Sequence, residues 1–245
     1  MEFIYIATFF VALISSILSG LAGGGGGFIM APYWLVTGMT PAQGATTGAC
    51  MALGMSGSSL AAFRGTEHMS KRKKLTIGLL ALTFVASMVG PFFLQHIQVD
   101  AFKPILAVVT IASLPLIFVK RKDITLGGHN QKIGLLLIGL LLLASSFITS
   151  SAFSIFIAIV LSQLLGFSIL QGTVVRRCMG IIQSAVIFII LVVLGNFVWQ
   201  HALAGMLGGM IGSYFGTKFA IKRGETFAKY ALAAGALASS LFLLI

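Results

Sequence analysis

The stretch SGLAGGGGGFIMAPYWLVTG, residues 19–38, decides the fold, because it places five consecutive glycines between two strongly apolar runs. Each glycine costs about 1 kcal/mol relative to alanine inside a helix, so the run ends any helix that reaches it. The sequence therefore predicts a helix over 3–22, a break at the glycines and a short helix over 28–37. The glycines are Gly23, Gly24, Gly25, Gly26 and Gly27.

The composition around this stretch is that of a membrane protein. Of 245 residues, 58% are hydrophobic and 9% are charged, with a mean hydropathy of +1.06, whereas a soluble domain carries about 25% charge. Several apolar runs are close to the roughly 20 residues that a spanning helix needs. The polar loops are too short to hold a soluble catalytic domain. The predicted fold class is an all-α integral membrane protein, and no enzyme is predicted.

The formal net charge of +11 does not indicate a nucleic-acid partner. Basic residues beside spanning segments follow the rule that cytoplasmic loops retain Lys and Arg. The opening MEFIYIATFF has no basic region before its apolar run, so we expect the first helix to be retained rather than cleaved as a signal peptide. The predicted location is the lipid bilayer.

Basic clusters orient ten predicted segments. Placing the loops 64–74 and 120–132 and the cluster Lys218, Lys222 and Arg223 in the cytoplasm requires five crossings in each half, with both chain termini outside. The segments are 3–22, 28–37, 41–63, 75–94, 102–119, 133–149, 152–165, 170–195, 198–219 and 227–245. Eight spans, with the two short segments not crossing, would instead leave basic residues outside.

The two halves resemble each other. GMTPAQGATTGACM (38–51) aligns with GFSILQGTVVRRCM (166–179) at five of fourteen positions, and SMVGPFF (87–93) aligns with GMIGSYF (209–215). Two tandem units of five crossings point in opposite directions through the bilayer. We therefore expect inverted repeats over 1–122 and 133–245 in a single membrane domain, each with one short or broken helix, an organisation typical of secondary transporters.

A helix break in the membrane can bind an anion. Glycine N–H groups without helical partners, next to a helix N-terminus, supply donors and a positive dipole end. In the second half, Thr149, Ser150, Ser151 and Ser154 stand where the first half has glycines. The alternative is close helix packing through small residues.

A second group of polar residues lies at the start of the third segment of each half. Their predicted role is substrate binding. Arg176 and Arg177 diverge by about 100° around a helix, so one can extend to the lipid headgroups while the other binds an oxyanion in its fork. The alternative is that both mark the inner interface. The group is Gln43, Thr46 and Thr47 in the first half and Gln171, Thr173 and Arg176 in the second.

Other polar residues recommend no cofactor or metal site. His96 and His201 are expected to be solvated on the outer side, and Tyr33 and Trp34 to be interface anchors or packing residues. No buried carboxylate is predicted, which leaves a proton or sodium ion as the possible coupling ion.

These motifs resemble the sulfite exporter TauE/SafE family. GLAGGGGGFIMAPYWLVTGMTPAQGATTG, followed by MSGSSLAAFRG, is similar to that family's glycine-rich run, later proline and Gly-x-x-Pro-x-x-Ala-x-x-Thr pattern. The stretch LAGMLGGMIGSYFGTKFAIK resembles its C-terminal end. The resemblance implies an inner-membrane permease for small sulfur-containing anions. The family's second glycine-rich run is replaced here by SSAFSIF.

The sequence thus predicts a secondary transporter for a small anion, such as sulfite or an organosulfonate, working by alternating access. The alternative is a membrane thiol–disulfide electron carrier, because Cys50 and Cys178 occupy equivalent repeat positions. A non-transporting assembly factor is disfavoured because the loops offer no docking surface.

Overall fold

A computed structural model describes residues 2–22, 27–66, 73–94, 96, 128–148, 154, 157, 160–161 and 164–223. All regular elements in these ranges are helices, which confirms the all-α class for this part of the chain. The predicted segments 102–119 and 227–245 lie outside the described residues. The helices are α1 (Glu2–Ala22), α2 (Gly27–Val36), α3 (Pro41–Phe63), α4 (Lys73–Leu94), α6 (Gly128–Ile148), α8 (Ile169–Val193) and α9 (Trp199–Arg223).

The glycine run separates two helices as predicted. α1 ends at Ala22 and α2 begins at Gly27, while residues 23–26 lie outside the described part. α2 has only 10 residues and contains Pro32, so it is half the length of a spanning helix. Of the second predicted short segment, Ser154, Ile157 and Leu161 are helical and buried, and their spacing places them on one helix face.

Three described helices are long and apolar enough to cross a membrane: Phe3–Leu21, Lys74–Phe92 and Leu170–Val193, with a shorter apolar helix at Ile133–Ser146. α3 and α9 are less apolar because small residues fill them. Both lie against two other long helices, where small side chains allow close approach. Their composition therefore reflects packing within the bundle.

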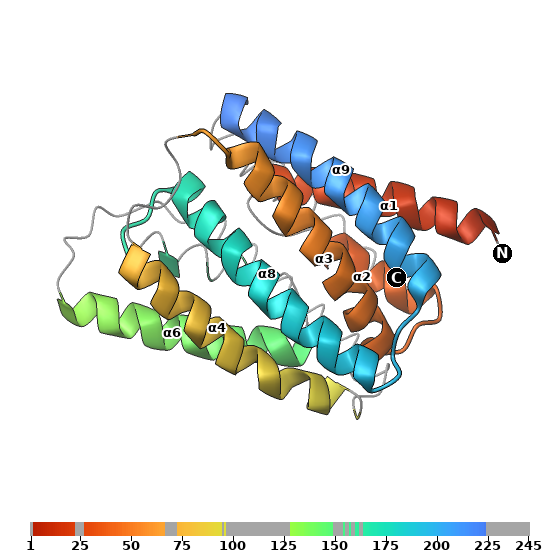
Figure 1. Cartoon of the computed structure of the whole chain (residues 1–245), viewed down its shortest axis with the longest axis horizontal. Coiled ribbons are helices and arrows are strands. Elements are labelled where there is room, and N and C mark those ends of the chain that lie inside the picture. The colour runs from red at the N-terminus through yellow and green to blue at the C-terminus, as the bar shows by residue number, and fades with distance from the viewer. Residues whose placement is uncertain are drawn as a thin grey trace.

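The long helices pack in a continuous series: α1 on α9, α9 on α3, α3 on α8, α8 on α4, and α4 on α6 (Figure 1). α1, α3 and α9 run in one direction, and α4, α6 and α8 run in the other. We call these sets the first and second helix groups. Each group takes one helix from the other half of the sequence, since α9 joins α1 and α3, and α4 joins α6 and α8.

Close main-chain contacts join α1 to α9 in the first group and α4 to α6 in the second. A Cβ on α9 at Gly208, Gly212 or Gly216 would overlap the carbonyl oxygens of Phe9, Leu13 and Ile17 on α1, respectively. A Cβ at Gly90 of α4 would overlap the Ser146 carbonyl of α6. Polar contacts also tie α9 to α3, where Oγ of Ser213 donates to the Met55 carbonyl at 2.9 Å.

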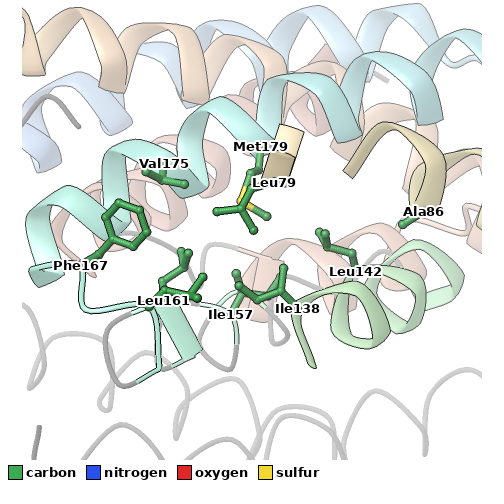
Figure 2. Packing of buried hydrophobic residues seen from close by; sticks show 10 residues of the cluster. Leu79, Ala86, Ile138, Leu142, Ile157, Leu161, Phe167, Val175 and Met179 are labelled. Atoms are coloured by element: carbon green, nitrogen blue, oxygen red, sulfur yellow. The ribbon is translucent and has the colours of Figure 1, made fainter. Parts of the chain in front are cut away.

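The second helix group surrounds an apolar core, shown in Figure 2. Side chains of α4, α6 and α8 meet those of the segment that precedes α8, and all of them are at most 3% exposed. The members are Leu79, Ala86, Ile138, Leu142, Ile157, Leu161, Leu165, Phe167, Val175 and Met179.

Most described basic residues stand at helix ends. The C-terminal ends of α3 and α9 and the N-terminal ends of α4, α6 and α8 gather at one end of the bundle (Figure 1). The basic residues at these ends are Arg64, Lys73, Lys74, Lys132, Lys218, Lys222 and Arg223. Only Arg176 and Arg177 lie within the body of a described helix away from such an end.

Replacing Gly212 by leucine tests the contact between α1 and α9. The added side chain must displace the Leu13 main chain rather than a flexible side chain, so we expect a loss of stability of about 1–3 kcal/mol, as for overpacked cores. Thermal unfolding in detergent measures it. Gly78→Leu is the control, because a Cβ there meets no atom within 4 Å; equal melting temperatures for both variants would contradict the packing.

Candidate anion site

The starts of α3 and α8 are built alike. Gly38 and Gly166 have φ of +81° and +65°, a left-handed conformation that glycine adopts without a steric penalty. Two residues later, Thr40 and Ser168 cap the helices with nearly the same backbone angles, φ/ψ of −66°/158° and −65°/160°. Each glycine, cap and following glutamine is 128 positions from its counterpart.

The glutamines of the predicted site complete capping boxes at these starts. Oε1 of Gln43 accepts from the Thr40 N–H at 3.0 Å, and Oε1 of Gln171 accepts from the Ser168 N–H at 3.3 Å. In turn, Oγ1 of Thr40 accepts from the Gln43 N–H, and Oγ of Ser168 accepts from the Gln171 N–H, each at 3.2 Å. Both amides therefore hold the helix N-termini, which the sequence analysis did not anticipate.

The predicted threonines are buried on these helices. Oγ1 of Thr46 donates to the Ala42 carbonyl at 2.7 Å, and Oγ1 of Thr47 lies 4.0 Å from Sδ of Met39. Thr173 is 8% exposed. The two threonines of α3 thus contact residues at and just before the start of α3 rather than an open site.

Arg177 is buried, with 6% of the residue exposed. Its Nη2 donates to the Ser19 carbonyl at 2.7 Å and to Ser19 Oγ at 3.2 Å. Ser19 lies in the last turn of α1, directly before the glycine run. From the sequence, only Arg176 was expected to bind the substrate, and one arginine of the pair was expected to extend to the headgroups. Both instead donate to protein groups inside the bundle, because the faces of α8 that carry them are covered by other segments.

Arg176 contacts the second short segment. Its Nη2 donates to Oγ of Ser154 at 2.9 Å, and Ser154 is 5% exposed. The neighbouring arginines therefore reach the end of α1 in one half and the serine-rich segment in the other. Ser150 and Ser151 of that segment, like Gly23, Gly24, Gly25 and Gly26, lie outside the described residues, while Gly27 begins α2.

Two buried donors at this place, Nε of Arg176 and Nε of Arg177, have no hydrogen-bond partner within the described structure. Oγ of Ser16 also has none there, but Ser16 lies against Gly212 of α9 rather than at the arginines. The five acidic residues of the chain are at positions 2, 67, 100, 123 and 225, and only Glu2 belongs to the described part, at the far end of α1. Two buried guanidinium groups thus have no carboxylate within the described structure, although buried charges require a partner.

Gly180 lets α3 approach α8 closely beside Arg176. It follows Arg176 by one turn of α8, and a Cβ there would lie 3.1 Å from Ser56 Oγ on α3 and 3.6 Å from Nη1 of Arg176. The guanidinium fork is suited to carboxylate, sulfonate and other oxyanions. The arrangement can therefore bind a small anion where α1, α3 and α8 converge.

The structure does not bring the α3 threonines to this place. α3 and α8 are antiparallel and Ser56 faces Gly180, so Arg176 lies toward the C-terminal end of α3. Thr46 and Thr47 precede Ser56 by about 10 residues, a distance of roughly 15 Å along the helix. They lie at the other end of the seam between α3 and α8.

His201 is buried in α9, which corrects the expectation of a solvated outer residue. It is 8% exposed, and its Nδ1 lies 2.9 Å from Oγ1 of Thr8. Trp34, 4% exposed, and Tyr33 pack nearby, which confirms packing for Trp34 rather than anchoring. The sequence already indicated that His201 could be buried, because position 201 falls within the apolar segment predicted over 198–219.

The two cysteines do not meet. Both are free thiols, and Sγ of Cys50 lies 4.0 Å from Sδ of Met206 on α9. The register of α3 against α8 places Cys178 opposite a position about 8 residues from Cys50, roughly 12 Å along the helix. This geometry gives no support to a thiol–disulfide carrier.

Comparison with known proteins identifies the family. The model of the sulfite exporter TauE/SafE family matches residues 8–243. The chain belongs to this family. A probable membrane transporter protein of Haemophilus influenzae is 26% identical over 226 residues, which are 90% of this chain and 87% of the relative. No solved structure matches the chain.

A second relative covers less of the TauE/SafE chain. The probable membrane transporter protein YfcA of Escherichia coli strain K12 is 36% identical over 104 residues, which are 42% of this chain and only 37% of that relative's length. The family and the names of these relatives identify the chain as a membrane transporter rather than an enzyme.

The capping boxes can be tested separately from ligand binding. Thr40→Ala removes the hydroxyl that accepts from the helix and should cost about 1 kcal/mol, measured by thermal unfolding. Gln43→Glu should keep the melting temperature, because glutamate also completes a capping box. A Gln43→Glu variant as unstable as Thr40→Ala would show that Gln43 acts otherwise.

Proposed function

We propose that this TauE/SafE protein is a secondary transporter that moves a small sulfur oxyanion or organosulfonate, such as sulfite, across the inner membrane by alternating access. The observation that carries the proposal is the buried Arg176 and Arg177 pair, whose Nε atoms have no partner and which has no carboxylate within the described structure. A bound anion would supply the missing acceptors and compensate the charge.

The family supports the substrate class. Its description is that of a sulfite exporter, and the two relatives are named as probable membrane transporters. Sulfite and sulfonates present several oxygens around one sulfur. Such an anion can accept from two guanidinium groups at once, which suits the two Nε donors that have no partner within the described structure.

Inverted repeats over 1–122 and 133–245 are part of the proposal. The packing supports them, because exchanging α1 with α6, α3 with α8 and α4 with α9 turns each helix contact in the series into another contact of the same series. The opposite directions of α3 and α8, and the matching glycine turns and capping boxes at their starts, support the same relation.

Alternating access would move the two helix groups against each other. Between long helices, the groups meet mainly along α3 and α8, whereas main-chain contacts hold α1 to α9 and α4 to α6. The bonds of Arg177 to Ser19 join the second group to the first. An anion at the arginines would compete for these bonds, and its binding would thereby change the position of one helix group relative to the other.

The distribution of charge gives the proposed orientation. The described basic helix ends gather at one end of the bundle, which we assign to the cytoplasm by the positive-inside rule. The N-terminal end of α1 then lies outside, and the proposal extends the outside location to the C-terminus and a crossing to each of the ten predicted segments.

Arg177→Gln tests the anion site. Glutamine can still donate to Ser19 but carries no charge, so we expect the affinity for sulfite to fall about ten- to a hundredfold, given the roughly 1.5–3 kcal/mol of a charged hydrogen bond. Uptake of ³⁵S-labelled sulfite into proteoliposomes at fixed pH measures the change as a raised half-saturation concentration. Arg177→Lys, which keeps the charge but not the fork, should be intermediate.

Lys222→Ala is the matched control, because it removes an exposed cation at the end of α9 and should leave uptake unchanged. Each variant is first compared with the unaltered protein by melting temperature. Folded Arg177→Gln protein that takes up sulfite with the original half-saturation would overturn the proposed site. Unaltered protein that moves neither sulfite nor methanesulfonate would overturn the function.

A further inference from the structure

His201 joins the second half of the chain to the start of the first. It lies in the first turn of α9, and its imidazole packs against α1 and α2 with 8% of the residue exposed. The ring meets Tyr5 edge to face at 4.9 Å and Trp34 at 6.1 Å between centroids. Its Nδ1 lies 2.9 Å from Oγ1 of Thr8. A titratable side chain is thus buried where α1, α2 and α9 meet.

Two hydroxyls connect His201 to α2. Oγ1 of Thr8 lies 2.7 Å from the Tyr33 hydroxyl. The Ile4 carbonyl is 2.8 Å from Thr8 Oγ1 and 3.3 Å from the Tyr33 hydroxyl, so it can accept from either. His201, Thr8, Tyr33 and the Ile4 carbonyl therefore form one network.

This network satisfies both charge states of the imidazole. A hydroxyl donates one proton and accepts at two lone pairs. When Nδ1 of His201 carries no proton, Thr8 donates to it and accepts from Tyr33. When Nδ1 is protonated, it donates to Thr8, and Thr8 turns its own proton to the Ile4 carbonyl. A proton can therefore be gained or lost without leaving an unpaired buried group.

The described side chains around His201 carry no charge that would compensate an imidazolium; Glu2 lies one turn before Tyr5 on α1, and its side chain is outside the described part. The titratable groups that the described neighbours present are Tyr5 from α1, Tyr33 from α2 and Cys50 from α3, whose Sγ contacts Met206 further along α9. The described side chains around the ring include no carboxylate and no second cation. Histidine changes charge between pH 5 and 8, whereas tyrosine and cysteine ionise at higher pH.

The same helices connect this network to the arginines. α1 carries Thr8 near one end and Ser19, the partner of Arg177, near the other. α2 carries Tyr33 and begins at the glycine run that follows α1. A change in the hydrogen bonds of His201 therefore acts on both helices that border the break.

We propose that His201 is the proton-binding site that couples transport to a pH gradient, taking up one proton at Nδ1 as the anion binds and releasing it with the anion. This inference rests on the proposed function. The imidazolium adds positive charge to a bundle that binds an anion, so proton and anion bind cooperatively and cross in the same direction. Thr8 positions the ring and accepts a hydrogen bond from the protonated Nδ1.

Proteoliposomes holding the full chain test this with ³⁵S-labelled methanesulfonate and sulfate, whose charges do not change between pH 6 and 8. Exchange at equal pH on both sides measures anion movement alone. Net uptake with an acidic exterior measures coupling. For the unaltered protein we expect exchange at equal pH and uptake at least tenfold higher with the gradient. His201→Gln and Thr8→Val should keep exchange and lose the stimulation.

His96→Gln is the matched control, because His96 is exposed and contacts the Phe92 carbonyl; it should keep the stimulation. If the unaltered protein exchanges neither anion and takes up no sulfite, the proposed function fails. If it exchanges an anion but the pH gradient does not stimulate net uptake, the proton site is overturned and the proposed transport function is retained. The same conclusion follows if the gradient stimulates uptake by His201→Gln equally. Loss of exchange together with stimulation in both folded variants would make His201 structural and also overturn the inference.

Discussion

Two guanidinium charges inside an apolar bundle are the constraint around which this structure is organised. Arg176 and Arg177 are held by the Ser154 hydroxyl and by the hydroxyl and carbonyl of Ser19. These neutral acceptors leave both Nε atoms without a partner. A purely structural arginine at this depth would be expected to pair with a carboxylate, because an uncompensated buried charge is costly. The proposed oxyanion would supply the acceptors that the described residues do not.

The helix packing supports the proposed alternating access. Glycines bring the main chains of α1 and α9 together, and likewise those of α4 and α6, so each helix group is tightly joined within itself. Between the groups, α3 and α8 meet through small residues such as Ser56 and Gly180. The arginines lie on this seam. Because α4 and α9 are each packed with helices of the other half, the halves are interlocked, and movement along the seam is the freedom that remains.

Local sequence signals were sufficient for most of the helices. The predicted segment 41–63 coincides with α3, and the segments 3–22, 28–37 and 170–195 differ from α1, α2 and α8 by at most two residues at either end. Glycine runs and cap residues act on the chain within a turn or two, so they can be read without knowledge of distant contacts. The capping glutamines were nevertheless assigned to a ligand, because a polar residue beside an apolar run looks the same in either role.

By itself, the sequence determined that this is a membrane protein of helices with a break at its glycine run, since hydropathy and helix breaking depend on residue type and spacing alone. It left open whether Arg176 and Arg177 bind a ligand or mark the inner interface. Tertiary structure decided which residues share a site. It brought Ser19 of α1 to Arg177, separated Thr46 and Thr47 from the arginines, and buried His201 against Thr8. The physical reason is that these contacts join residues as many as 193 positions apart, and which faces meet depends on the close packing of glycine surfaces across the whole bundle.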